Sequence, residues 1–197
     1  MSIAVIMMLT ATVAVAAQGR GAGRTEDKSV SVCLENTAGF DVLPLAEQTA
    51  SKMFAEAGVT IDWHRGLLGC PAEGILISLS LLSNHAPADL PPQALAYALP
   101  YEGSHIVIFY DRLQRKVKPV QMSSLLAHVL VHEVTHILQG IHRHSGRGLM
   151  KANWNGSDYQ AMTWKPLPFT PEDIDLIHRG LAARAARAAS QLTWKPQ

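Results

Sequence analysis

Alternating strand-like and helix-like segments predict an α+β fold of the α/β type, in which helices pack on a twisted mixed β-sheet. The size of the chain and the usual handedness of strand connections also support this prediction. The chain has 197 residues, 48% of them hydrophobic, which is enough to bury the core of one domain. Right-handed crossovers between strands would place the helices behind the same sheet. Because the chain is short and contains no internal repeat, we expect one domain that covers residues 29–189.

The first half of the chain predicts three strands and one helix. Ser29 to Glu35 alternates between apolar and polar residues, which is typical of a strand. Pro44 to Ala57 carries apolar residues on one helical face and is followed by Gly58, so we expect a helix that ends there. Val59 to Trp63 and Ile75 to Leu82 are predicted as two further strands.

The second half predicts a short edge strand at Ala94 to Leu99, after a loop at Asn84 to Pro92 that is rich in Pro and Ala. His105 to Tyr110 contains no charged residue and is predicted as a buried strand. Pro171 to Ala189 has apolar residues at helical spacing and is predicted as the last helix. Between Met150 and that helix we expect an irregular stretch, and after it a tail at residues 190–197.

The N-terminus resembles a secretory signal. Ile3 to Ala17 is apolar, too short to span a membrane comfortably, and ends in small residues. We therefore expect a signal peptide at residues 1–17 and a disordered, glycine-rich leader at residues 18–28. The pair Met1-Ser2 lacks Lys and Arg, so an N-terminal anchor helix is the alternative. After cleavage we expect a secreted or periplasmic monomer with no stable membrane insertion.

Cysteine usage agrees with export, and the net charge argues against one class of partner. The chain has two cysteines, Cys33 and Cys70, and an even pair in an exported protein predicts a disulfide. The alternative is that Cys33 reaches a metal as an inhibitory thiolate, but it lies in a predicted strand. A net charge of +1 without a stripe of Lys and Arg argues against a nucleic-acid partner.

The segment His132-Glu133-Val134-Thr135-His136 carries the strongest chemical signal. It lies in a run from Val120 to Gln139 with apolar residues every three or four positions, which predicts a helix. On a helix, imidazoles four residues apart share one face and can bind one metal ion. Zn²⁺ takes three protein ligands and a water in catalytic sites, and Glu133 would deprotonate that water. The alternative is a buried helix that carries two histidines by accident.

The residues that follow resemble the metzincin clan of zinc peptidases. The clan motif is H-E-x-x-H-x-x-G-x-x-H followed by a methionine in a tight turn, and His142 falls in its register. Met150 lies at the matrixin distance from His142. The resemblance implies a metzincin-like twisted mixed sheet with an active-site helix, a Met-turn and a C-terminal helix. It also implies a Zn²⁺-dependent endopeptidase that hydrolyses a peptide or protein substrate.

The glycine departs from the clan pattern. Gly140 stands one position later than in the family, and Gln139 takes the family position. The register from His132 and from Met150 favours His142 as the third ligand. The displaced glycine makes His144 the rival, because a longer helix moves everything after it.

By the same resemblance, an edge strand beside the cleft pairs with the substrate and the chain after the methionine walls a side-chain pocket. The residues concerned are Ala94, Leu95, Ala96, Tyr97, Ala152 and Trp154. Core packing is the alternative role for Trp154. His128 precedes the first ligand by one turn, so we expect a packed core histidine.

Two other functions remain open from the sequence. In a gluzincin-type peptidase the third ligand would be an acid on a later helix, with Glu172 as the candidate. In a non-catalytic, metal-stabilised envelope or binding module the metal would only hold the fold. Glu133 argues against the second, because a structural site needs four closed ligands and no general base.

Overall fold

A computed structural model describes residues 28–37, 39–83, 86–88, 90–99 and 104–193 of the chain. The expected signal peptide, nearly all of the expected leader and residues 194–197 lie outside this range. The expected tail begins at residue 190, but the last helix continues to Thr193. Within the described residues, no helix is both long and apolar enough to cross a membrane.

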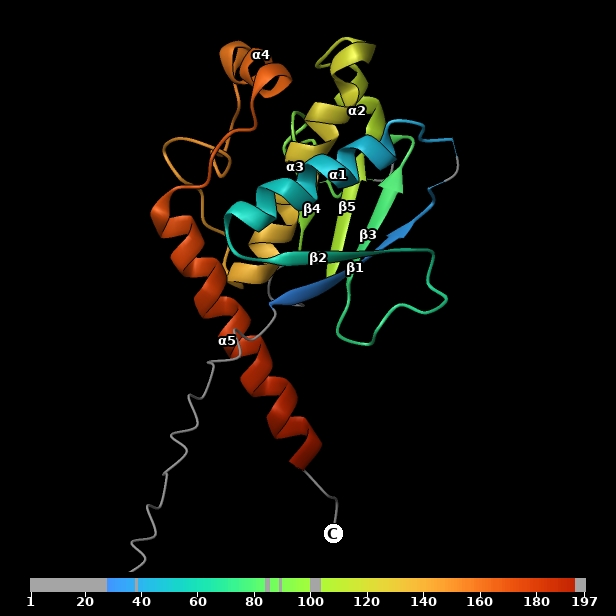
Figure 1. The fold of residues 1–197 in the computed structure, drawn as a ribbon. Helices are drawn as coiled ribbons and strands as arrows, with labels where there is room; N and C mark the ends of the chain where they lie inside the picture. The colour runs from blue at the N-terminus through green and yellow to red at the C-terminus, as the bar shows by residue number, and fades with distance from the viewer. Residues whose placement is uncertain (1–27, 38, 84–85, 89, 100–103, 194–197) are drawn as a thin grey trace, which may run out of the picture.

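Five strands form one twisted mixed sheet in the order β2-β1-β3-β5-β4 (Figure 1). Its four parallel strands are β1 (Ser29–Glu35), β2 (Thr60–Arg65), β3 (Ile75–Ser80) and β5 (His105–Phe109). The edge strand β4 (Ala96–Ala98) runs antiparallel to β5, with Tyr97 opposite Val107. The predicted strands and the predicted edge position of β4 are confirmed, with ends that differ by at most two residues.

Two helices cover one face of the sheet and lie side by side (Figure 1). These are α1 (Leu43–Glu56) and α3 (Met122–Gln139), the predicted histidine helix. The turn η2 (Pro119–Gln121) leads into α3, so the regular helix begins two residues later than predicted. The last helix, α5 (Pro171–Thr193), contacts α3 and then extends beyond the sheet (Figure 1).

Two short helices were not predicted. One is α2 (Tyr110–Gln114), which begins directly where β5 ends. The other is α4 (Gly156–Trp164), which replaces part of the expected irregular stretch. It has only one buried residue, Met162, and so no apolar stripe that periodicity could detect. The side chain of Asn155 caps its first turn by accepting from the backbone N–H groups of Ser157 and Asp158.

The core lies between the sheet and the pair α1 and α3. Nearly every residue of α3 is buried, and this includes polar ones, among them His128, Thr135 and Gln139. A helix buried on all sides needs a partner for each polar side chain, so its histidines are held in defined positions.

The predicted disulfide is present. Cys33 and Cys70 are bonded at an S–S distance of 2.02 Å, and the described residues contain no free cysteine. The bond ties the buried strand β1 to the loop after β2. Cys33 is therefore engaged in the core, which leaves no inhibitory thiolate at this position.

Candidate metal centre

The helix α3 presents His132, Glu133 and His136 at one end of its length. The two histidines are four residues apart and share a face. Gly140 ends the helix in the left-handed conformation, with φ of 67°, and its N–H donates to the His136 carbonyl. Residues that carry a Cβ adopt this backbone angle less readily than glycine, so Gly140 fixes where the chain leaves the helix.

The two helical imidazoles point their Nε2 atoms at one another, 3.1 Å apart. Nδ1 of His132 lies 3.1 Å from the Leu149 carbonyl, and Nδ1 of His136 lies 3.4 Å from the Ile141 carbonyl. A carbonyl only accepts, so both Nδ1 atoms carry the proton and both Nε2 atoms keep a lone pair. Nitrogens bound tetrahedrally to zinc at about 2.0–2.1 Å would be about 3.4 Å apart, close to the observed spacing.

His144 completes the group. One ligand atom from each of His132, His136 and His144 lies within 4.8 Å of the others, and these are the three described residues that could hold a metal together. The ring of His144 is 5.3 Å from that of His132 and 4.9 Å from that of His136. The structure therefore brings the rival histidine, rather than the preferred one, into the group.

His142 lies beside the group instead. Its ring stacks on that of His136 at 5.1 Å and meets that of His144 edge-on at 5.0 Å. The physical reason is the late glycine. The helix continues to Gln139, so the chain needs more residues after Gly140 before a side chain can return to the metal face.

Burial sets the charge state of these groups. It lowers the pKa of His132 to about 4 and that of His136 to about 3, with smaller effects from the neighbouring histidines. Burial, followed by the proximity of His142, also lowers the pKa of His144. The imidazoles are therefore neutral at pH 7, as metal ligation requires. Burial raises the pKa of Glu133 to about 8.

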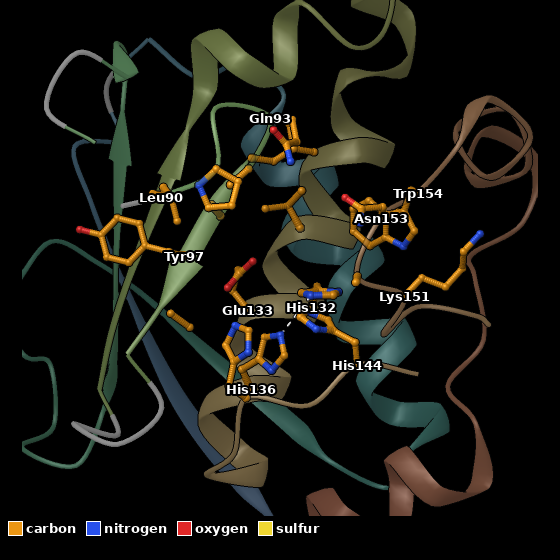
Figure 2. Close-up of a pocket in the computed structure, with 18 of the residues that line it drawn as sticks. Leu90, Gln93, Tyr97, His132, Glu133, His136, His144, Lys151, Asn153 and Trp154 are labelled. Atoms are coloured by element: carbon orange, nitrogen blue, oxygen red, sulfur yellow. Dashed lines mark hydrogen bonds between the residues drawn. The ribbon is translucent and has the colours of Figure 1, made fainter. Parts of the chain in front are cut away.

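This donor set fits Zn²⁺. One class of catalytic zinc site has three neutral imidazoles as its protein ligands and leaves the fourth coordination position open. The open side here is a cavity of about 380 Å³. His132, Glu133 and His136 all face it, as does His144 (Figure 2).

The buried Met150 lies in the tight turn that the resemblance implied. Its carbonyl accepts from the Ser145 N–H at 2.6 Å, and the Leu149 N–H donates to Pro168 at 2.9 Å. Gly148 has φ of 74°, and a Cβ there would lie 2.4 Å from the Pro168 carbonyl oxygen. Only glycine permits this close approach, which holds the turn against the chain that leads into α5.

All six positions expected to contact substrate lie along the cavity. Ala94, Leu95, Ala96 and Tyr97 lie on and directly before the edge strand β4, and Figure 2 shows Tyr97 on that side of the cavity. Ala152 and Trp154 belong to the opposite wall, which Lys151 ties to α4 through its ion pair of 2.5 Å with Asp158. Sequence reasoning missed further lining residues, namely Leu90, Pro91, Gln93, Lys116, Val129, Lys151 and Tyr159.

Two other candidate residues lie outside the metal group. His128 has both ring nitrogens occupied, with Nδ1 2.6 Å from the Ser124 carbonyl and Nε2 accepting from the Leu167 N–H at 3.0 Å. It is a core histidine that ties α3 to the chain before α5. Glu172 forms an ion pair of 2.5 Å with Arg143 and does not join the three histidines.

The sequence prediction also missed Asp173, a fully buried carboxylate beside the loop that carries His144. Burial raises its pKa, but hydrogen bonds from Ser145, Thr170 and Arg143 outweigh this and hold the pKa below its usual value. The signal that could have revealed it is the spacing of Thr170 and Asp173, which is that of a capping box.

Comparison with known proteins identifies the fold. No family model matches the chain, and no curated protein matches it. Among solved structures, the chain is similar to the crystal structure of archaemetzincin from Methanopyrus kandleri, with a TM-score of 0.53 and 16% sequence identity. The match covers 80% of this chain and 98% of that one. The protein thus has a metzincin-like fold, as the sequence predicted.

Proposed function

We propose that this protein is a zinc-dependent endopeptidase. The observation that carries the proposal is a buried glutamate beside three histidines whose ligand atoms converge at the floor of an open cavity. The similarity to archaemetzincin supports the fold that such a site requires. His132, His136 and His144 would hold the ion, and bound Zn²⁺ would supply Lewis-acid polarisation of a water molecule and of the scissile carbonyl.

Glu133 would move the protons. Its carboxylate takes one from the attacking water and passes it to the leaving amine. The burial of Glu133 keeps bulk water from competing for these steps. The Nδ1 contacts of His132 and His136 with backbone carbonyls keep both ligands in the tautomer that binds metal.

The substrate would be an extended peptide. The strand β4 is at the edge of the sheet and its residues line the cavity, so a peptide can add beside it through main-chain hydrogen bonds. Trp154 stands on the other wall (Figure 2) and Tyr159 also lines the cavity, so a substrate side chain would lie against them. We further propose that the protein works outside the cytoplasm, in a secreted or periplasmic setting, which the Cys33–Cys70 disulfide supports.

The test is the variant Glu133→Ala, assayed with a peptide library beside the wild type. We expect it to retain zinc and the fold but to lose cleavage by about 10²–10⁴-fold. Glu56→Ala, an exposed glutamate at the end of α1, is the matched control and should cleave as the wild type does. A zinc-loaded wild type that cleaves no peptide would reject the proposal and favour a non-catalytic module.

A further inference from the structure

The residues on either side of His144 are tied to a single buried carboxylate. Nη1 of Arg143 lies 3.1 Å from Oδ1 of Asp173, and the Ser145 hydroxyl donates to the same oxygen at 2.5 Å. Asp173 lies in the first turn of α5 and is fully buried. These contacts join the loop that carries the third histidine to a helix far along the chain.

The Asp173 carboxylate is itself fixed. Its second oxygen, Oδ2, accepts from the Thr170 N–H at 2.9 Å and from the Thr170 hydroxyl at 2.7 Å. Its backbone carbonyl also accepts from the side-chain amide of Gln139, at 3.3 Å, at the end of the metal helix. Because both carboxylate oxygens have partners, the group cannot turn without losing hydrogen bonds, and it serves as a rigid anchor.

The loop alternates between two sides. Arg143 and Ser145 turn to Asp173, whereas His142 and His144 line the cavity. Ser145 is also held by its backbone, whose N–H donates to the Met150 carbonyl. His144 lies between the two anchored residues, whereas His142 precedes both. The anchors therefore account for the placement of His144 among the ligands.

We propose that Asp173 is a positioning residue for the third metal ligand, because it holds Arg143 and Ser145 and thereby fixes the His144 imidazole. The proposal rests on the metal site described under the proposed function. Residues that orient a metal ligand from outside are typically worth about 10–100-fold in metal affinity, and we expect an effect in that range.

The experiment compares Asp173→Asn with Asp175→Asn. Both substitutions remove one charge from α5 at constant size, but Asp175 pairs with Arg179 on the exposed surface. Zinc affinity is measured by competition with a chelator. We expect Asp173→Asn to weaken it by about 10–100-fold. Asp175→Asn should stay within about threefold of wild type, because exposed ion pairs contribute little.

A second readout separates positioning from general stability. The visible absorption of the Co²⁺-loaded protein reports the coordination of the ion, so it should change in Asp173→Asn and not in Asp175→Asn. If Asp173→Asn fails to fold, Ser145→Ala serves in its place. It removes one of the two links to the carboxylate without leaving a buried charge, and we expect about 10-fold weaker zinc binding.

Wild-type zinc affinity and an unchanged Co²⁺ spectrum in the folded Asp173→Asn or Ser145→Ala protein would overturn the proposal. The same holds for a lower melting temperature of the metal-free variant with no change in affinity. A wild type that binds zinc but cleaves no peptide would reject the peptidase and leave the role of Asp173 intact. A wild type that binds no zinc would reject the metal site itself.

Discussion

Nδ1 of His132 lies 3.1 Å from the carbonyl oxygen of Leu149, the residue before Met150. The indole N–H of Trp154 donates to the same oxygen, also at 3.1 Å. One backbone carbonyl in the turn at Met150 thus contacts the first histidine of the group and a tryptophan of the cavity wall. The helix α3 and this wall of the cavity are linked through the Leu149 carbonyl.

The shared carbonyl predicts the effect of Trp154→Phe. The variant keeps an aromatic ring in the wall and removes only one donor, while His132 still donates to Leu149. We expect the free energy of unfolding to fall by about 1 kcal/mol, the usual net value of one hydrogen bond, with zinc content unchanged. Urea unfolding and zinc per mole after dialysis measure the two quantities. Trp164→Phe, at a site that is 84% exposed, is the control and should change neither.

The convergence of three imidazoles predicts a split between two neighbouring alanine variants. His144→Ala should lose zinc on dialysis, because removal of one of three ligands weakens the site severely. His142→Ala should keep near-full occupancy, because that ring only stacks beside the group. Zinc lost in His142→Ala and kept in His144→Ala would restore the register of the clan motif and contradict the geometry described above.

Local patterns were enough to predict the helix Met122–Gln139 and two of the three histidines that could hold a metal. The spacing of His132 and His136 and the apolar periodicity around them are properties of the helix alone. The sheet was predictable for the same reason, because each of its strands alternates or is uniformly apolar. The edge position of Ala96–Ala98 came from the clan resemblance and from the short length of the segment.

The third histidine of the group, His144, could not be predicted from the local sequence. Which imidazole joins His132 and His136 depends on where Gly140 ends the helix and on what holds the loop afterwards. The holder is Asp173, which lies 30 positions after Arg143, so no local pattern reveals the contact. The helix Gly156–Trp164 was missed for another reason, because it is defined by the Asn155 cap rather than by an apolar stripe.

The burial of His128 predicts a pH-dependent term in stability. Burial lowers its pKa from 6.5 to about 4, so the unfolded chain binds a proton between these pH values that the folded protein does not. Stability is therefore complete above pH 6.5 and falls as the pH drops toward 4, by up to about 3 kcal/mol for this residue.

The variant His128→Gln tests this term. An amide can still donate to the Ser124 carbonyl and accept from the Leu167 N–H, but it does not titrate. The free energy of unfolding of the metal-free variant, measured at a series of pH values, should fall less steeply than that of the wild type in this window. His132 and His136 contribute to both proteins alike, so the difference in slope belongs to His128. If the free energy of unfolding fell equally steeply with pH in the two proteins, protonation of His128 would not destabilise the fold, and the prediction would be wrong.

The crossing of α5 over α3 predicts the effect of Gly180→Ala. A Cβ at Gly180 would lie 1.8 Å from the carbonyl oxygen of Leu138 and 3.1 Å from Cα of Gln139, both backbone atoms that cannot rotate away. Alanine favours the helix by up to about 1 kcal/mol, but here the helices must separate, and overpacking typically costs about 1–3 kcal/mol. We expect lower stability in urea and, because α5 carries Asp173, weaker zinc binding as well.

Gly156→Ala is the control for Gly180→Ala. A Cβ at Gly156 meets nothing within 4 Å, so this substitution should be neutral or stabilising. A Gly180→Ala protein with wild-type stability would mean that α5 can move away from α3 at no cost. Asp173, which lies on α5, could then not hold the His144 loop in a fixed position.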